Sequence, residues 1–378
     1  MRFRSRLLDI ACLASIAGVV AIFFWPVLLL GYWIPRGGGD LVSFLWPMMR
    51  FSAASFRAGV VPLWNPYQYS GAPFLADNQS GLFYPLNLLV AATTGEPSYE
   101  IMEVLVALHL WVAGANAFAL SRGLGMRRLA ALCAGVAFAF SDLFITHLGN
   151  LNLNATAAWL PMLILLTHRA LTRRSIKWAA VAGMLVSVTA LAGHAQMLLY
   201  SGVALGTYVL YRLAVDRHQG LAHAAQTVGL AAMIAAIGFG GAALTLLPAY
   251  EMAGHTGRGH LSYVEATRYS VPPQALIGLL APGFYGRGPS GFWGPWDRVE
   301  VGYAGVATLI LAFLGCCAWV RIRLRKSPAQ TCVGEADGDS GSRAPLGFFA
   351  ILIIGGFLLA LGNHTLLYRI LYEVVPTF

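Results

Sequence analysis

Residues 36–51 read RGGGDLVSFLWPMMRF, and they open a polar, aromatic and proline-rich stretch that continues to residue 100. The same stretch contains PLWNP at 62–66 and ADNQ at 76–79. Hydrophobic sequence lies on both sides of it. A loop of this length without a regular pattern is more often a functional element than a connector. We therefore predict that residues 36–100 form a functional loop between two membrane spans.

The composition is that of an integral membrane protein. Of the 378 residues 58% are hydrophobic and 11% are charged, and the mean hydropathy is +0.66. The net charge of +9 comes from short basic clusters between apolar segments. Membrane topology explains such clusters better than nucleic-acid binding, so we expect no nucleic-acid partner. The five cysteines have neither zinc nor disulfide spacing in an outer loop, and we assign them no role.

Apolar segments long enough to cross a bilayer recur along the chain. They predict an all-α polytopic helical bundle of about nine spans that forms one membrane domain, residues 1–378. The first apolar segment is too long for a signal peptide and reads as an uncleaved span. The two segments within 178–212 could also form a single hairpin. The predicted spans are 8–33, 101–120, 129–146, 155–172, 178–193, 197–212, 224–247, 301–320 and 346–361.

The distribution of Lys and Arg predicts the orientation. With the N-terminus in the cytoplasm, seventeen basic residues fall in inner segments and eight in the longer outer ones. The positive-inside rule then places two large loops outside, after the first and seventh spans. These loops cover about 36–100 and 248–300, and a cytoplasmic linker covers about 321–345.

The first outer loop has a pattern of its own. Between Leu41 and Phe56 the apolar residues recur at helical spacing, which predicts a helix lying in the membrane interface, started or kinked by Pro47. The later prolines, up to Pro85, are expected to enforce turns. Asp77 lies in this turn-rich part.

Two carboxylates in this loop are candidates for chemistry. Asp40 follows three glycines just beyond the first span, and it could act as a general base; the alternative is a solvated aspartate or a helix N-cap. Asp77 could bind a divalent cation or a sugar hydroxyl; the alternative is an Asx-turn. If the protein uses a divalent cation, Mg²⁺ or Mn²⁺, we expect Asp40 and Asp77 to hold it.

Further polar residues are expected at the outer face. His147, with Asn150 and Asn152, would lie at one outer turn, and His194 with Gln196 at the next. The alternative for such residues is helix capping. Arg258 and Arg268 could bind a phosphate group. Glu300 is a binding candidate, but it could equally form a salt bridge with Arg298.

Several short motifs, taken in order, resemble the YfhO-like bacterial membrane proteins, which are grouped with the GT-C glycosyltransferases. The resemblance covers nearly the whole chain. The motifs are Gly39-Asp40, PLWNP at 62–66, GAP at 71–73, ADNQSGLFYP at 76–85, HLGN at 147–150, GHAQ at 193–196, LAPGFYG at 280–286, EVGYAG at 300–305, LGNHT at 361–365, LYR at 367–369 and VP at 375–376.

This resemblance implies a function. A GT-C-like protein would take a sugar from a polyprenyl-phosphate carrier on the outer face of the bacterial cytoplasmic (inner) membrane and pass it to an envelope glycan, lipid or protein. The essential acidic residue of the family maps to Asp40. Substrate contacts would come from Asp77, Gln79, Tyr84, His147, His194, Gln196, Arg258, Arg268 and Glu300.

Two other functions stay open. A transporter or flippase for lipid-linked glycans would be expected to place its polar segments near the bilayer midplane, in matching halves. A non-catalytic scaffold for envelope assembly would tolerate replacement of Asp40. In YfhO-like proteins the segment that corresponds to residues 363–378 is followed by further spans. The resemblance therefore implies that this chain is truncated at its C-terminus.

Overall fold

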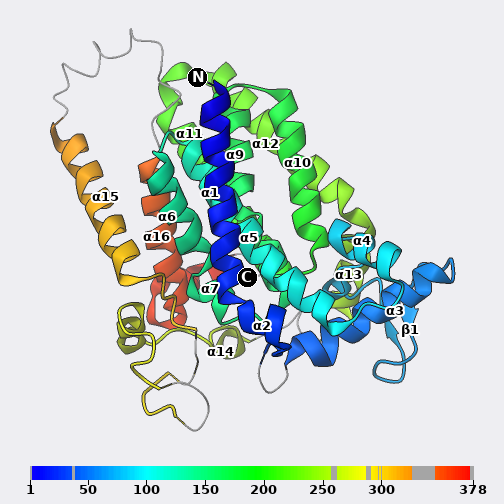
Figure 1. Cartoon of the computed structure of the whole chain (residues 1–378). Coiled ribbons are helices and arrows are strands. Elements are labelled where there is room, and N and C mark those ends of the chain that lie inside the picture. The colour runs from blue at the N-terminus through cyan, green and yellow to red at the C-terminus, as the bar shows by residue number, and fades with distance from the viewer. Residues whose placement is uncertain are drawn as a thin grey trace. The chain divides into compact units, whose positions relative to one another are not determined.

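The computed structural model describes residues 2–35, 39–256, 262–286, 291–296, 298, 300–325 and 345–374. It separates into two compact units, one of residues 1–139 and 147–256 and the other of residues 140–146 and 257–378. Nearly all regular structure in the described residues is helical (Figure 1). The one sheet found there joins β1 (Trp64–Asn65) and β2 (Ala72–Pro73) in antiparallel fashion. The predicted all-α membrane fold is confirmed at this level.

The helices of the first unit begin and end at residues whose chemistry explains the boundary. Pro161 lies in the first turn of α9, the Ser175 hydroxyl accepts the Trp178 N–H at the start of α10, and Gly220 precedes α12 with a φ of +87°. The main helices are α1 (Arg2–Phe23), α2 (Trp25–Leu30), α5 (Tyr99–Gly123), α6 (Arg128–Ala139), α8 (Leu151–Ala158), α9 (Leu160–Thr172), α10 (Ile176–Leu191), α11 (Ala195–Val215), α12 (Leu221–Gly241) and α13 (Ala243–Gly254).

Small residues let these helices approach closely. A Cβ atom at Gly135 of α6 would lie 2.8 Å from the Gly114 carbonyl oxygen of α5. A Cβ atom at Gly183 of α10 would lie 2.7 Å from the Ile237 side chain of α12. Contacts of this kind are typical of helix packing in membranes, where apolar surface alone does not drive association. They give the site a rigid support.

Among the described residues, five helical segments are long and apolar enough to cross a membrane: Arg6–Phe23, Tyr99–Gly123, Arg128–Ile145, Ala195–Val215 and Leu221–Gly241. Four other apolar helices in the described part of the chain are shorter: Pro85–Thr94, Ile176–Leu191, Val306–Ala318 and Leu346–Ala360. The predicted span 155–172 is divided at Trp159 between α8 and α9. The number of nine spans and the sides of the loops stay predictions.

The first predicted outer loop contains more helix than expected. The helix expected over Leu41–Phe56 is found as one π-helical turn, Leu41–Leu45, followed by α3 (Trp46–Arg57), with Pro47 in the first turn of α3. A 3₁₀ turn forms at Asn78–Ser80. The turn predicted at Pro85 is wrong: Pro85 starts α4 (Pro85–Thr94). A proline is favourable there because the first helical position needs no N–H donor.

The second unit consists of short helical segments and two longer helices, α15 and α16. The predicted span 301–320 starts later, at α15 (Val306–Arg325), because residues 300–305 are not helical and Gly302 and Gly305 have φ values of 71° and 91°. The other helices are α7 (Asp142–Ile145), α14 (Tyr263–Ala266), the 3₁₀ segment Pro273–Leu279, α16 (Leu346–Ala360), the 3₁₀ turn Gly362–His364 and α17 (Leu366–Val374). Most of the predicted linker 321–345 lies outside the described residues.

Candidate functional site

The ADNQ segment of the first loop forms a fixed turn. Asp77 Oδ1 accepts the Gln79 N–H at 3.0 Å, which is the Asx-turn expected as the alternative to ligand binding. The Asn152 side chain donates to the Gln79 carbonyl oxygen, and Asn87 Nδ2 donates to the Gly81 carbonyl oxygen at 3.0 Å. Residues 77–81 are therefore held by hydrogen bonds from both α8 and α4.

Gly193 completes the place where this turn docks. It lies between α10 and α11 with a φ of +90°, a conformation that favours glycine. A Cβ atom there would lie 2.4 Å from the Asn78 carbonyl oxygen and 3.0 Å from Asn152 Nδ2. The missing side chain thus allows the first loop to touch the α10–α11 turn directly.

Tyr84 anchors the loop in the core of the first unit. Its side chain is buried, its hydroxyl lies 2.8 Å from His109 Nε2, and Trp159 Nε1 donates to it at 3.1 Å. His109 Nδ1 lies 2.7 Å from the Leu105 carbonyl oxygen, so Nδ1 carries the proton and Tyr84 donates to Nε2. Burial raises the pKa of Tyr84 to about 12. Tyr84, predicted to touch substrate, thus has its hydroxyl engaged by two core side chains.

Asp40 is exposed, and it sits at the start of the π-helical turn without capping it through its side chain. Pro35 connects this residue to the turn at 147–150. A Cβ atom added to Gly39 would lie 2.9 Å from the Cγ atom of Pro35. A Cβ atom added to Gly149 would lie 3.0 Å from the same Cγ atom. The glycine before Asp40 and the turn of His147 therefore share one neighbour.

Polar residues of the two predicted outer turns lie at the N-terminal ends of α8 and α11. Asn150 Oδ1 accepts the Leu153 N–H at 3.1 Å, and His194 Nδ1 accepts the Met197 N–H at 3.2 Å, so both cap helices. Burial lowers the pKa of His194 below its ordinary value of 6.5, and the nearby His147 lowers it further. Neutral His194 keeps its proton on Nε2, which leaves a donor for a ligand. Gln196 donates to the Tyr200 hydroxyl at 2.6 Å.

Glu103 is a site residue that the sequence analysis missed. It is buried in the first turns of α5, and its Oε1 accepts the Ile34 N–H at 2.9 Å. Tyr99 donates to the Ile34 carbonyl oxygen, and its ring contacts those of Trp33 and Trp46. These contacts hold the backbone at Ile34, near the end of the predicted first span. A carboxylate inside the predicted span 101–120 was the signal that could have found it.

In the second unit, Arg268 and Arg298 lie beside one aromatic ring. The guanidinium groups of Arg268 and Arg298 lie 5.7 and 4.6 Å from the centre of the Tyr269 ring. Arg298 Nε lies 3.2 Å from Glu300, which confirms the salt bridge considered as an alternative for Glu300. Arg258 lies outside the described residues.

Asp142 is a second residue that the sequence analysis missed. Its Oδ2 accepts the Val301 and Gly302 N–H groups at 2.7 and 2.8 Å. The carboxylate thereby holds the backbone that follows Glu300. Its partners lie about 160 residues away in the sequence, so no local pattern revealed it.

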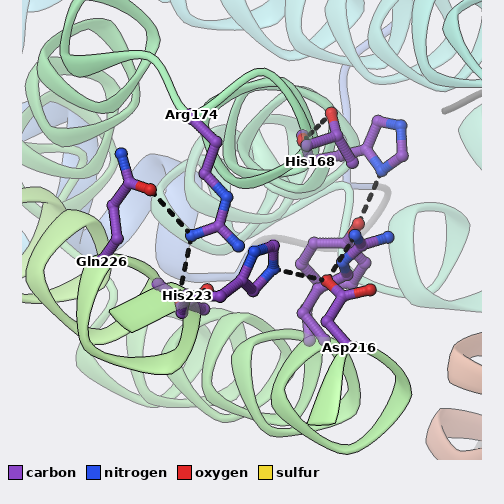
Figure 2. A network of polar contacts seen from close by, with 9 residues as sticks. His168, Arg174, Asp216, His223 and Gln226 are labelled. Carbon is purple, nitrogen blue, oxygen red and sulfur yellow. Dashed lines mark hydrogen bonds and ion pairs between the residues drawn. The ribbon is translucent and has the colours of Figure 1, made fainter. Parts of the chain in front are cut away.

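A separate polar network lies at the other end of α11, about 30 Å along the helix from His194 (Figure 2). Asp216 Oδ2 pairs with Arg212 at 2.6 Å and approaches His223 Nε2 at 3.4 Å. Arg174 donates to the His223 carbonyl oxygen at 2.9 Å and to Gln226 Oε1 at 3.3 Å. These contacts connect the turn between α9 and α10, and the C-terminal end of α11, to the first turns of α12. From the sequence, the basic residues of this region predict only the orientation of the chain in the membrane.

Among the described residues, no group of three or more His, Cys, Asp or Glu side chains is arranged to hold a metal ion. The predicted divalent cation therefore stays a prediction. No protein-family model matches the sequence, and no curated protein or solved structure is significantly similar to it. The resemblance to YfhO-like proteins thus rests on the motifs quoted above.

Proposed function

We propose that the protein is a membrane glycosyltransferase of the GT-C type. It would move a sugar from a polyprenyl-phosphate donor to a glycan, lipid or protein of the cell envelope, at the outer face of the bacterial inner membrane. The observation that supports this most is the exposure of Asp40 at the start of the Leu41–Leu45 turn, a few residues after Ile34, whose N–H is bound by the buried Glu103. A base in a transfer reaction needs both access to substrate and a fixed position.

The reaction would invert the configuration of the sugar. The acceptor hydroxyl oxygen bonds to C1 of the donor sugar while the C1–O bond to phosphate breaks. The acceptor proton passes to Asp40, and the polyprenyl phosphate leaves with the bonding electrons. Arg268 or Arg258 would balance the charge on that phosphate, because a guanidinium group suits phosphate oxygens.

The other predicted site residues would orient the substrates. His194 has Nε2–H free to meet a sugar hydroxyl, since its Nδ1 already caps α11. His147, Gln196 and Glu300 would act with it, and the fixed turn of Asp77 and Gln79 would shape the edge of the site.

The transporter alternative has less support. Polar side chains do lie buried along α5, but His109 bonds to Tyr84 and Leu105, and Asn116 Nδ2 donates to the Ala158 carbonyl oxygen at 2.9 Å. Such partners hold helices together and leave these groups little capacity to coordinate a passing substrate.

Replacement of Asp40 tests the proposal. Asp40→Asn keeps the size of the side chain and removes the base, so transfer from labelled polyprenyl-phosphate sugars to envelope extract should fall by about 10²–10⁴-fold. Glu96→Gln is the matched control, because Glu96 lies in the same loop and its carboxylate forms an exposed ion pair with Arg50 at 3.8 Å. Transfer by Asp40→Asn at the rate of the control would refute the assignment.

A further inference from the structure

The first loop encloses a pocket of about 380 Å³ between the Leu41–Arg57 helical segment and the β1–β2 hairpin, whose elements are marked α3 and β1 in Figure 1. Its volume lies within the range of about 300–1,000 Å³ typical of small-molecule sites. Six residues dominate its chemistry: Phe44, Phe51, Asn65, Tyr67, Gln68 and Tyr69.

One wall of the pocket is aromatic and rigid. The Phe51 ring packs edge-on against the buried Phe74 at 4.9 Å and against Tyr67 at 6.1 Å. Phe44 and Phe51 both pack on a buried cluster that includes Met48 and Phe74. The wall therefore presents aromatic surface that does not need to be ordered when a ligand binds.

The rim of the pocket is built at a conformational cost. Tyr67 and Tyr69 are 86% and 85% exposed, although each carries a large apolar ring. Tyr69 and Ser70 have φ values of 52° and 63°, two consecutive left-handed conformations in residues other than glycine. Such backbone is disfavoured, and it concentrates at ligand-binding and catalytic segments.

The pocket also contains a buried polar group with spare hydrogen-bonding capacity. Asn65 is only 6% exposed, and its Oδ1 accepts the Tyr67 N–H at 3.0 Å. That contact uses only the carbonyl oxygen of the amide, so the Nδ2 group, which belongs to a residue lining the pocket, can donate to a ligand. Gln68 adds a second amide to the lining. No acidic or basic side chain lines the pocket.

We infer that this pocket binds one residue of a neutral saccharide. An aromatic wall suits the C–H face of a sugar ring, and amide groups suit its hydroxyls. A phosphate or carboxylate ligand would find no cation in the lining, and a purely apolar ligand would leave the Asn65 amide buried without a partner. The inference rests on the proposed function only in assigning this saccharide to the acceptor rather than to the lipid-linked donor.

The test uses isothermal titration calorimetry to measure binding of chitotriose, mannotriose and maltotriose to the full chain in detergent. Tyr67→Ala removes part of the aromatic rim, and Asn65→Asp keeps the Oδ1 that holds Tyr67 while it removes the amide donor. Each should weaken binding of the best trisaccharide by about tenfold or more. Tyr67→Phe keeps the ring and should stay within about twofold. Tyr250→Ala, at a tyrosine that is 81% exposed outside the pocket, should bind as the wild type does.

The outcomes separate this inference from the proposed function. Asp40→Asn should bind the trisaccharide normally while it loses transfer. If wild-type protein never transfers sugar but the pocket variants lose binding, the glycosyltransferase proposal fails and the saccharide pocket stands. The absence of binding by all three trisaccharides at millimolar concentration, or equal binding by folded Asn65→Asp and Tyr67→Ala proteins, would overturn the inference. If a polyprenyl-phosphate sugar displaces the trisaccharide from wild-type protein, and the Asn65→Asp and Tyr67→Ala proteins no longer bind that lipid-linked sugar, the pocket is a donor site and the assignment to the acceptor is overturned.

Discussion

Replacement of Gly193 by alanine tests the docking of the first loop most directly. The new Cβ would lie 2.4 Å from the Asn78 carbonyl oxygen and 3.0 Å from Asn152 Nδ2, and the nearer atom belongs to the backbone. No rotation of a side chain can relieve that contact, so either the 77–81 turn or the α10–α11 turn has to move.

The size of the effect follows from two terms. Alanine at a φ of +90° costs about 1–3 kcal/mol of backbone strain. Overpacking of a filled site costs about 1–3 kcal/mol more. The free energy of unfolding should therefore fall by about 2–6 kcal/mol, a large part of the 5–15 kcal/mol that holds a typical domain together. We expect the melting temperature to fall by roughly 5–20 °C.

The assay is thermal unfolding of the purified protein in detergent, followed by tryptophan fluorescence. Gly202→Ala is the matched control. Gly202 lies within α11, and a Cβ there would meet no atom within 4 Å. Alanine is the better helix former by about 1 kcal/mol, so this variant should melt at or slightly above the wild-type temperature. Equal melting temperatures for the two variants would refute the docking of the 77–81 turn on Gly193.

Three further predictions concern the same unit. Tyr84→Phe leaves His109 Nε2 and Trp159 Nε1 without their partner and should lower the free energy of unfolding by about 1–3 kcal/mol, whereas Tyr250→Phe should not; equal melting curves would contradict the anchor. Because the folded-state pKa of His194 lies below 6.5, its contribution to stability is full above pH 6.5 and declines as the pH falls toward that lowered pKa. His194→Asn, which keeps a capping acceptor, should flatten this decline in melting temperature between pH 7 and 5, and an unchanged slope would exclude His194 as its source. In a cysteine-free background, an impermeant thiol reagent should label Ser70→Cys but not Gln219→Cys in intact cells, and the reverse pattern would invert the predicted orientation.

Local spacing of apolar residues predicted one helical segment of the first loop and missed another, α4. The apolar spacing over Leu41–Phe56 corresponds to a π-helical turn and α3. The Asx-turn of Asp77 and the pair of Arg298 with Glu300 were also foreseeable, because their partners lie two residues away.

Contacts between distant residues were not predictable in this way. Glu103 meets Ile34 across 69 residues, and Trp159 meets Tyr84 across 75. No periodicity reports such pairs. Pro85 shows a different limit, since the same fixed φ suits a turn and the first residue of a helix, and the surrounding structure decides between them. The pocket at Asn65 likewise depends on how a hairpin folds over a helix.

The docking of the first loop on Gly193 also bears on how the protein is made. Gln79 is synthesised 114 residues before Gly193, so at 5–20 residues per second the loop exists for about 6–23 s before the turn that receives it. Asn152, which bonds to Gln79, is synthesised 73 residues after it, and Gly193 is synthesised only at the end of the interval. The first loop is therefore among the first parts of the chain to leave the ribosome and among the later parts to reach its final position.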